Sequence, residues 1–230
     1  MNKIFGMIAL IAIVLVGGYF AWMSVSGPEL SAVQSATTTP PGNDSAITTL
    51  AVKEETNTYT VGMQYPQFGI PSIDAQITNM MDDIIVEFRG FPANPPESAV
   101  SKNELTGTFE STYIGPDIVS AKLIISQYTG GAHPNTLFTG INFDRTSGKL
   151  LLLNDVLPTI GMTIAQVSAE STKQLKARLG DVMFEEGANT NPENFSSFVI
   201  SKDKVTFIFQ PYQVAAYSAG PQEVSFDRKR

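Results

Sequence analysis

The chain has 230 residues, of which 43% are hydrophobic and 16% charged, an ordinary composition for a globular protein. Its 22 acidic and 15 basic residues give a net charge of −7, which disfavours binding to the phosphates of nucleic acids. The sequence contains no cysteine, which excludes disulfides, thiol nucleophiles, lipoprotein attachment and cysteine-ligated metal centres.

An almost wholly apolar segment, Ile4–Trp22, lies near the amino terminus. As a helix it would span about 28 Å, close to the hydrocarbon thickness of a bilayer. We therefore predict that residues 1–23 form an uncleaved signal anchor, or alternatively a secretory signal peptide removed after Ser24-Val25-Ser26. Lys3 precedes the segment and acidic Glu29 follows it, so in both cases the rest of the chain should lie outside the cytoplasm.

Residues 24–57 are rich in Ser, Thr, Ala and Pro and show neither helical nor alternating periodicity. This composition predicts a disordered linker. The remaining residues, 58–230, are numerous enough to form one domain with its own hydrophobic core.

The first predicted elements of this domain are a strand and a helix. Tyr59–Tyr65 alternates between apolar and polar residues, as a half-buried strand does. Ser72 is then placed to cap a helix that carries Asp74 in its first turn and apolar residues at helical spacing as far as Phe88.

The central region predicts an antiparallel meander. Leu105–Tyr113 and Ile118–Tyr128 flank the turn signal Gly115-Pro-Asp117. Leu137–Asp144 follows as a further strand and turns through Gly148 into Lys149–Leu153.

The last third contains a helix followed by short strands. Thr163–Leu179 carries an inner apolar stripe and ends before Gly180, a plausible C-cap. Phe198–Ile200 and Lys204–Gln210 form a hairpin, and Gln222–Phe226 adds a final strand. The predicted fold class is α+β: an antiparallel meander with two main helices packed on one face, preceded by the transmembrane or signal helix.

His133 is the only histidine and lies in the loop Tyr128-Thr-Gly-Gly-Ala-His-Pro-Asn-Thr136. The Gly-x-Ser-x-Gly motif is absent from the sequence, and one imidazole is too few for a typical zinc hydrolase. His133 could act as a lone general base or share a metal site with Asp144. We favour a structural interpretation, in which the two glycines and Pro134 shape a turn and the imidazole either locks it or faces a ligand.

Two pairs of neighbouring carboxylates, Asp82-Asp83 and Glu185-Glu186, are candidates for acid–base chemistry. Adjacent side chains on a helix point about 100° apart, so such pairs do not converge on a substrate. We therefore predict a protein that is not an enzyme, with no catalytic residue, no cofactor and no metal.

Tyrosines near strand ends or in loops are the remaining signal. Tyr128 lies beside the histidine loop, and Tyr212 and Tyr217 lie in a long segment poor in charge. Tyrosine in such loops suits contact with proteins or sugars, although packing of the loop against the core is the alternative. The predicted ligand-binding residues are Tyr128, His133, Asn135, Tyr212 and Tyr217.

Two motifs resemble a bacterial extracytoplasmic domain family of unknown function: QYTGGAHPNTLFTGINFDRTSGKLLLLNDVL (127–157) and FIFQPYQVAAYSAGPQEVSF (207–226). The family includes the exported domain of the RsiV anti-sigma factor and the accessory domain of some polysaccharide deacetylases. The resemblance covers most of residues 58–226 and implies an α+β envelope domain; for RsiV it implies lysozyme binding. We expect neither sigma-factor binding nor deacetylation here, because the sequence offers no helix bundle and only one histidine for those activities.

The functional prediction is a membrane-tethered or secreted binding domain of the cell envelope. A cationic protein such as lysozyme is the first expected partner, because acidic proteins attract cationic ones at long range. Cell-wall glycan, that is peptidoglycan, is the second. A hydrolase that uses His133 and a spacer without a ligand are two further possibilities.

Overall fold

A computed structural model describes residues 36–37, 47–95 and 102–229 of the chain, with only the backbone of residues 36–37. All of them belong to one compact unit. The predicted anchor or signal helix, residues 1–23, lies outside the described residues. Within the described ranges, no helix has the length and apolar character needed to cross a bilayer.

Six strands form the first sheet, in the order of the chain. β3 and β4 are parallel, whereas every other neighbouring pair is antiparallel. A parallel pair requires a crossover connection, which the helix α2 (Pro71–Arg89) provides. The meander therefore contains one parallel step that the sequence did not predict. The strands are β1 (Ala36–Thr37), β2 (Thr48–Glu55), β3 (Tyr59–Gln67), β4 (Asn103–Ile114), β5 (Ile118–Tyr128) and β6 (Asn135–Asp144).

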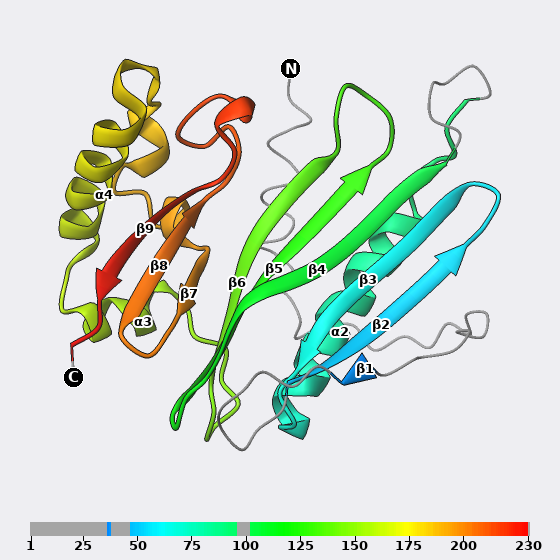
Figure 1. Ribbon diagram of the computed structural model, residues 1–230, viewed down its shortest axis with the longest axis horizontal. Helices are drawn as coiled ribbons and strands as arrows, with labels where there is room; N and C mark the ends of the chain where they lie inside the picture. Colours follow the sequence, from blue (N-terminus) through cyan, green and yellow to red (C-terminus); the bar gives the residue numbers. More distant parts are fainter. Residues whose placement is uncertain (1–35, 38–46, 96–101, 230) are drawn as a thin grey trace. The chain divides into compact units, whose positions relative to one another are not determined.

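One face of the first sheet is covered by α2 (Figure 1). The buried side chains of this helix follow one another at spacings of three or four residues, and they pack with β3 to form the first hydrophobic core. The helix begins at Pro71 after Ile70, so Ser72 is not the N-cap that the sequence predicted. Asp74 in the first turn instead accepts a hydrogen bond of 2.7 Å from the backbone N–H of Phe68, which joins the helix to the preceding loop.

The linker predicted over residues 24–57 contains two strands, because the short β1 lies within it and β2 occupies its last part. All eight residues of β2 pair with β3, and Leu50 and Val52 pack against the first core. The alternation within β2 is weak in the sequence, since Thr and Ala stand beside the two larger apolar residues. Pairing with a neighbour, which the sequence of β2 alone does not show, stabilises the strand.

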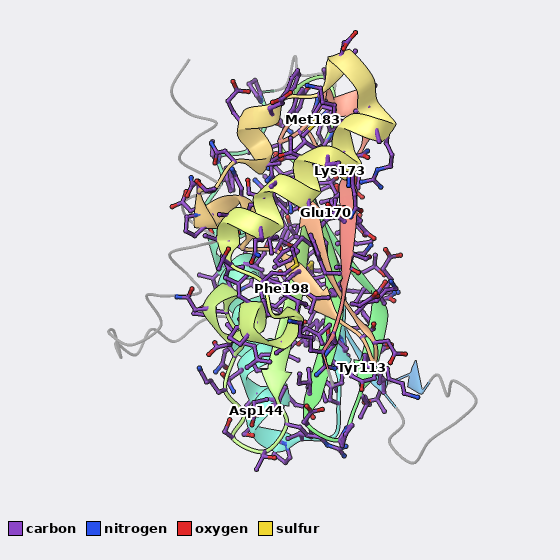
Figure 2. All side chains as sticks on the ribbon, turned by 90° about the vertical axis from the view of Figure 1, so that its left-hand side faces the viewer. Tyr113, Asp144, Glu170, Lys173, Met183 and Phe198 are labelled. Carbon is purple, nitrogen blue, oxygen red and sulfur yellow. The ribbon has the colours of Figure 1, made fainter. Side chains whose placement is uncertain are left out.

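A second, three-stranded sheet lies beside the first and has its own helices. Its core is separate from that of the first sheet and includes buried residues of α3 and α4. Figure 2 shows α4 (yellow) crossing this sheet. The α+β class is confirmed, with the two main helices on two sheets instead of one face. The elements are α3 (Leu153–Ile160), α4 (Ile164–Leu179), β7 (Phe198–Ile200), β8 (Lys204–Phe209) and β9 (Gln222–Asp227), with short 3-10 helices η1 (Gly180–Val182), η2 (Glu185–Ala188), η3 (Pro192–Phe195) and η4 (Tyr217–Ala219).

Helix α3 stands where the sequence predicted the end of a strand. Lys149–Leu153 forms only a single bridge to the first sheet, between Leu150 and Phe143. The carboxylate of Asp155 then accepts a hydrogen bond of 3.0 Å from the backbone N–H of Leu152 and starts the helix. Periodicity cannot separate a short apolar run in a strand from one at the start of a helix, which explains the missed element.

Buried polar side chains join the two sheets. The side-chain oxygen of Asn142 on β6 accepts hydrogen bonds from the Ser120 hydroxyl, at 2.7 Å, and from the backbone N–H of Ile200, at 3.1 Å. Its amide nitrogen donates to the carbonyl of Phe198 at 2.7 Å. Gly140, two residues before, allows this approach, because a Cβ atom there would lie 1.6 Å from the Phe198 carbonyl oxygen. The backbone of β7 at Phe198 therefore packs closely against the backbone of β6 at Gly140.

A charged group also bridges the sheets. Lys122 on β5 is buried, and its Nζ atom lies 2.5 Å from Glu110 on β4 and 2.7 Å from Glu223 on β9. Desolvation of Lys122 opposes its positive charge, but the hydrogen bonds and charges of the two carboxylates outweigh this effect and raise its pKa. The lysine therefore stays charged where the two sheets meet.

Candidate functional site

Two loops that are far apart in the sequence meet at one end of the sheets. The first joins β5 to β6 and carries His133, and the second joins β8 to β9 and carries Tyr212 and Tyr217. The imidazole of His133 stacks on the ring of Tyr217, with a centroid distance of 3.8 Å and an interplanar angle of 17°. The ring of Tyr212 lies 5.3 Å from that of Tyr217 and 6.2 Å from that of His133. We call these three residues the aromatic cluster.

Hydrogen bonds orient the rings of the aromatic cluster. The carbonyl of Pro134 lies 2.8 Å from Nδ1 of His133 and 3.4 Å from the hydroxyl of Tyr217. A carbonyl only accepts, so Nδ1 carries a proton in this contact. Nε2 of His133 lies 3.3 Å from the Tyr212 hydroxyl, within hydrogen-bonding distance. His133 therefore holds both tyrosine rings in place.

Two glycines and Tyr128 shape the histidine loop. Gly130 and Gly131 have φ angles of 97° and 110°, which side-chain-bearing residues rarely adopt. The hydroxyl of Tyr128 donates a hydrogen bond of 2.8 Å to the carbonyl of Gly131 and closes the loop on the end of β5. Tyr128 is thus placed next to the aromatic cluster and supports the loop that carries it.

Asn135, the remaining residue predicted to bind a ligand, is the first residue of β6 and is exposed. It pairs through the backbone register with Gln127, and its side chain makes no hydrogen bond to any other residue in the described ranges. The structure does not place Asn135 in the aromatic cluster, although both lie at the same end of the first sheet.

Tyr212 is presented by a tight turn. The backbone N–H of Gln213 donates to the carbonyl of Gln210 at 3.0 Å, and Tyr212 occupies the third position of this turn with a φ of 70°. A left-handed conformation is unfavourable for a residue with a Cβ atom. This residue is nevertheless 59% exposed, so packing into a core does not account for the conformation.

Two glutamines that the sequence analysis missed hold this turn. The side-chain amide of Gln210 accepts from the backbone N–H of Phe138 at 2.9 Å and donates to its carbonyl at 2.7 Å, as a neighbouring strand would. The side chain of Gln213 donates to the carbonyls of Gly187 and Asn194, at 2.8 and 3.0 Å. The sequence feature that could have identified these two glutamines is their position on either side of the Pro-Tyr dipeptide. The turn is thus fixed to β6 through Gln210 and to the short helices η2 and η3 through Gln213.

The alternative of a metal site shared by His133 and Asp144 conflicts with the structure. His133 precedes the first residue of β6 and Asp144 is its last residue, so the length of the strand, about 30 Å, separates them. Asp144 instead accepts hydrogen bonds in the turn that follows β6, from the backbone and hydroxyl of Ser147 and from the backbone of Thr146. Among the residues that the structure describes, no group of three His, Asp or Glu side chains could hold a metal ion.

The two carboxylate pairs lie at exposed positions on different elements. Asp82 and Asp83 are on α2, and Glu185 and Glu186 are on η2. Partial desolvation, followed by the charge of Asp83, raises the pKa of Asp82. Glu185 is occupied by an ion pair of 2.5 Å with Lys176. Neither pair belongs to the aromatic cluster.

Comparison with known proteins identifies two matched regions. Residues 157–229 match the family described as "Protein of unknown function (DUF3298)", and residues 52–136 match the family described as "Deacetylase PdaC". The first region contains the second sheet, and the second region contains the second half of β2, the strands β3 to β5 and the histidine loop. The aromatic cluster is therefore formed by one residue from one matched region and two from the other.

Two curated relatives are about one quarter identical to the chain over the aligned residues. It is 24% identical over 176 residues to the peptidoglycan-N-acetylmuramic acid deacetylase PdaC of Bacillus subtilis, covering 74% of this chain and 38% of that protein. It is 25% identical over 143 residues to the immunogenic protein MPT64 of Mycobacterium tuberculosis, covering 59% of this chain and 60% of that protein. The chain thus spans less than two thirds of either relative.

A solved structure shares the fold. A DUF3298 family member from Bacteroides fragilis superposes with a TM-score of 0.57 at 16% identity, over 85% of this chain and 90% of that one. Together with the two matched regions, this supports the predicted resemblance to a domain of unknown function related to a deacetylase accessory domain. The resemblance to the exported domain of RsiV stays a prediction.

Proposed function

We propose that this chain is a binding domain of the cell envelope and that the aromatic cluster contacts cell-wall glycan. The observation that carries the proposal is Tyr212, an exposed tyrosine held in a left-handed backbone conformation beside the stacked rings of His133 and Tyr217. Strained backbone persists where the surrounding structure imposes it, and such positions cluster at ligand sites.

The chemistry of the three rings suits a sugar. A tyrosine ring offers an apolar face and a polar hydroxyl, which match the alternating CH faces and hydroxyl edges of a saccharide. The rings of Tyr212 and Tyr217 are tilted by 36° to each other, so they are not an edge-to-face pair. The stacked imidazole fixes Tyr217 from behind, so little side-chain freedom is lost when a ligand binds.

The name of one relative is consistent with this ligand. The relative from Bacillus subtilis acts on peptidoglycan N-acetylmuramic acid, as its name states. We propose that this chain shares contact with the glycan but not the deacetylase activity, because the chain spans only 38% of the length of that protein. The apolar segment Ile4–Trp22 supports a position outside the cytoplasm, either anchored in the membrane or released after signal cleavage.

A cationic protein such as lysozyme is the second candidate partner. The net charge of −7 favours association with a cationic protein, and the resemblance to the exported domain of RsiV points to the same ligand. This attraction arises from the whole chain and involves no particular group of residues. It is therefore distinguished from glycan binding by its dependence on salt.

The experiment that tests the proposal is co-sedimentation of the full chain with purified peptidoglycan, comparing the parent protein with Tyr212→Ala. We expect the variant to lose at least about tenfold in affinity, since stacked aromatic residues dominate such contacts. Tyr113→Ala, which removes a half-buried tyrosine from β4, serves as the matched control and should bind as the parent does. Equal binding by Tyr212→Ala and the parent would contradict the proposal.

Lysozyme is tested in parallel by calorimetric titration at low and physiological salt, with an unrelated protein of equal positive charge as control. Binding to lysozyme alone that survives physiological salt would support the second candidate. Binding to both proteins that disappears with salt would show only that the chain is acidic.

A further inference from the structure

The face of the first sheet opposite α2 bears two rows of polar residues. Directly paired residues on neighbouring strands share a face, so the register places four side chains in one row. This first row contains Glu55, Thr60, Glu104 and Tyr128, on β2, β3, β4 and β5. It ends at the tyrosine whose hydroxyl holds the histidine loop.

The second row runs beside the first across the same strands. It consists of Lys53, Gly62, Thr106, Ser126 and Thr136, on β2 to β6. The hydroxyls of Ser126 and Thr136 lie 2.9 Å apart, which confirms that neighbouring members point to the same side. Four interstrand steps span about 19 Å, and the row ends three residues beyond His133. Both rows therefore lead from β2 towards the aromatic cluster.

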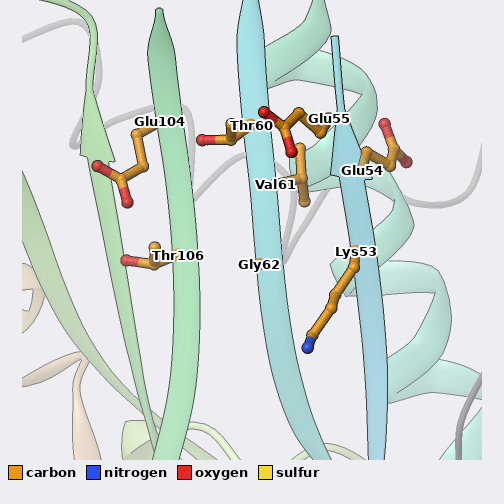
Figure 3. Close-up of a pocket in the computed structure, with 8 residues that line it drawn as sticks. All are labelled: Lys53, Glu54, Glu55, Thr60, Val61, Gly62, Glu104 and Thr106. Carbon is orange, nitrogen blue, oxygen red and sulfur yellow. The ribbon is translucent and has the colours of Figure 1, made fainter.

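A shallow depression of about 430 Å³ lies over the β2 to β4 part of these rows. Figure 3 shows Lys53 on β2, Thr60 on β3 and Glu104 and Thr106 on β4 around it. The hydroxyls of Thr60 and Thr106 and the charged groups of Lys53 and Glu104 make no hydrogen bond or ion pair with any other described residue. The depression thus offers donors and acceptors that the folded chain leaves available.

The charges around the depression balance. Glu54 forms an ion pair with Arg89, and Glu55 forms one of 2.8 Å with Lys102. The remaining charged residues of the lining are Lys53 and Glu104, whose charges cancel. The local charge is therefore zero, although the chain as a whole is acidic. This balance favours an uncharged ligand rich in hydrogen-bonding groups over a cationic protein.

We propose that the two polar rows form an extended subsite for a polysaccharide, so that a glycan strand held at the aromatic cluster continues across the open face of the first sheet into the depression. This inference rests on the proposed function. The ligand class is a neutral polymer of N-acetylated amino sugars, whose hydroxyl and acetamido groups meet the hydroxyls of Thr60 and Thr106 and the carboxylate of Glu104. Affinity then increases with the length of the glycan, because a short oligomer reaches only the aromatic cluster.

The test compares the dimer and the hexamer of N-acetylglucosamine in calorimetric titrations of the full chain. We expect the hexamer to bind about tenfold more tightly than the dimer, as one or two additional net hydrogen bonds would produce. Glu104→Gln and Thr106→Val keep the shape of the side chain and should weaken hexamer binding about fivefold while leaving dimer binding unchanged. Glu87→Gln, on an exposed position of α2, is the matched control and should change neither.

The outcomes separate this inference from the proposed function. Equal affinity for the two oligomers, with both lost in Tyr212→Ala, would overturn the extended subsite and leave the aromatic cluster as the glycan site. Tighter hexamer binding that Glu104→Gln and Thr106→Val do not alter would also overturn it. Failure of both oligomers to bind the parent, together with failure to bind peptidoglycan, would overturn the proposed function and this inference with it.

Discussion

Tyr212 adopts a φ of 70° although it carries a Cβ atom, and the residue is 59% exposed. The side chains of Gln210 and Gln213 impose this conformation by fixing the turn to Phe138 and to the carbonyls of Gly187 and Asn194. A glycine at this position would avoid the strain. The tyrosine is therefore unfavourable for stability at the residue where we place ligand contact.

Replacement of Tyr212 by glycine separates the effect of this residue on stability from its effect on glycan binding. We expect Tyr212→Gly to leave the free energy of unfolding unchanged or to raise it by up to about 1 kcal/mol, because relief of the left-handed conformation outweighs the entropy of glycine. Glycan binding should be lost in the same variant. Denaturant unfolding and peptidoglycan co-sedimentation measure the two quantities, with Tyr212→Ala as the variant that loses the ring and keeps the strain. A marked loss of stability in Tyr212→Gly would show that the ring is a packing residue.

At the residue scale, the sequence pointed to the members of the aromatic cluster but not to their arrangement. His133 was notable as the only histidine, and Tyr217 as a tyrosine in a loop poor in charge. Their stacking joins positions 84 residues apart, and local patterns carry no information about such a contact. The supporting role of Gln210 was missed for the same reason, since its partner is Phe138 on another sheet.

At the scale of elements, the turn after β6 shows how local hydrogen bonds position a strand. The carboxylate of Asp144 accepts from the backbone and hydroxyl of Ser147 and from the backbone of Thr146, and Gly148 closes the turn with a φ of 70°. The hydrogen bonds from Ser147, then those from Thr146, lower the pKa of Asp144. The turn orients the end of β6 opposite to the histidine loop.

This turn predicts a pH dependence of stability. A carboxyl whose pKa is lower in the folded than in the unfolded chain stabilises the fold above its unfolded pKa of about 4, and this contribution is lost as the pH falls through the folded value. Asp144→Asn should therefore be less stable than the parent at neutral pH and equal to it at strongly acidic pH. Thermal unfolding of both proteins at several pH values, from neutral to strongly acidic, measures this difference in stability. The control is Asp83→Asn on α2, and a pH-independent difference for Asp144→Asn would contradict the prediction.

Elements with complete local signals were predicted well. The helix near Thr163–Leu179 is α4, and Thr163 and Gln166 form the capping box that the sequence contains. The hairpin around Gly115-Pro-Asp117 is β4 and β5. The strand β2 and the helix α3 were missed because their apolar residues are few or form a short run, so that neighbouring elements decide their structure.

For the whole molecule, the junction between the two sheets determines whether the aromatic cluster exists. Each sheet has its own hydrophobic core, and the two regions match different families. Asn142, Lys122 and the close approach at Gly140 connect them. His133 belongs to one side of this junction, and Tyr212 and Tyr217 belong to the other.

The junction is tested by Gly140→Ala. The added Cβ atom would lie 1.6 Å from the Phe198 carbonyl oxygen, so β6 and β7 must separate. We expect a loss of about 3 kcal/mol in the free energy of unfolding, together with weaker glycan binding as His133 moves away from Tyr217. Gly62→Ala is the stability control, because a Cβ atom at that position meets nothing within 4 Å. Denaturant unfolding that is identical for both variants would contradict the close packing of the sheets.

The sequence by itself determined the composition class, the α+β fold and most of the helix and strand boundaries. Caps, turns and apolar periodicity are properties of neighbouring residues, and they act before distant parts of the chain meet. Only the tertiary structure decided that the strands divide into two sheets, that β3 and β4 are parallel, and that His133 stacks on Tyr217. These features depend on the register and packing of segments distant in the chain, which many residues determine together and which no local pattern records.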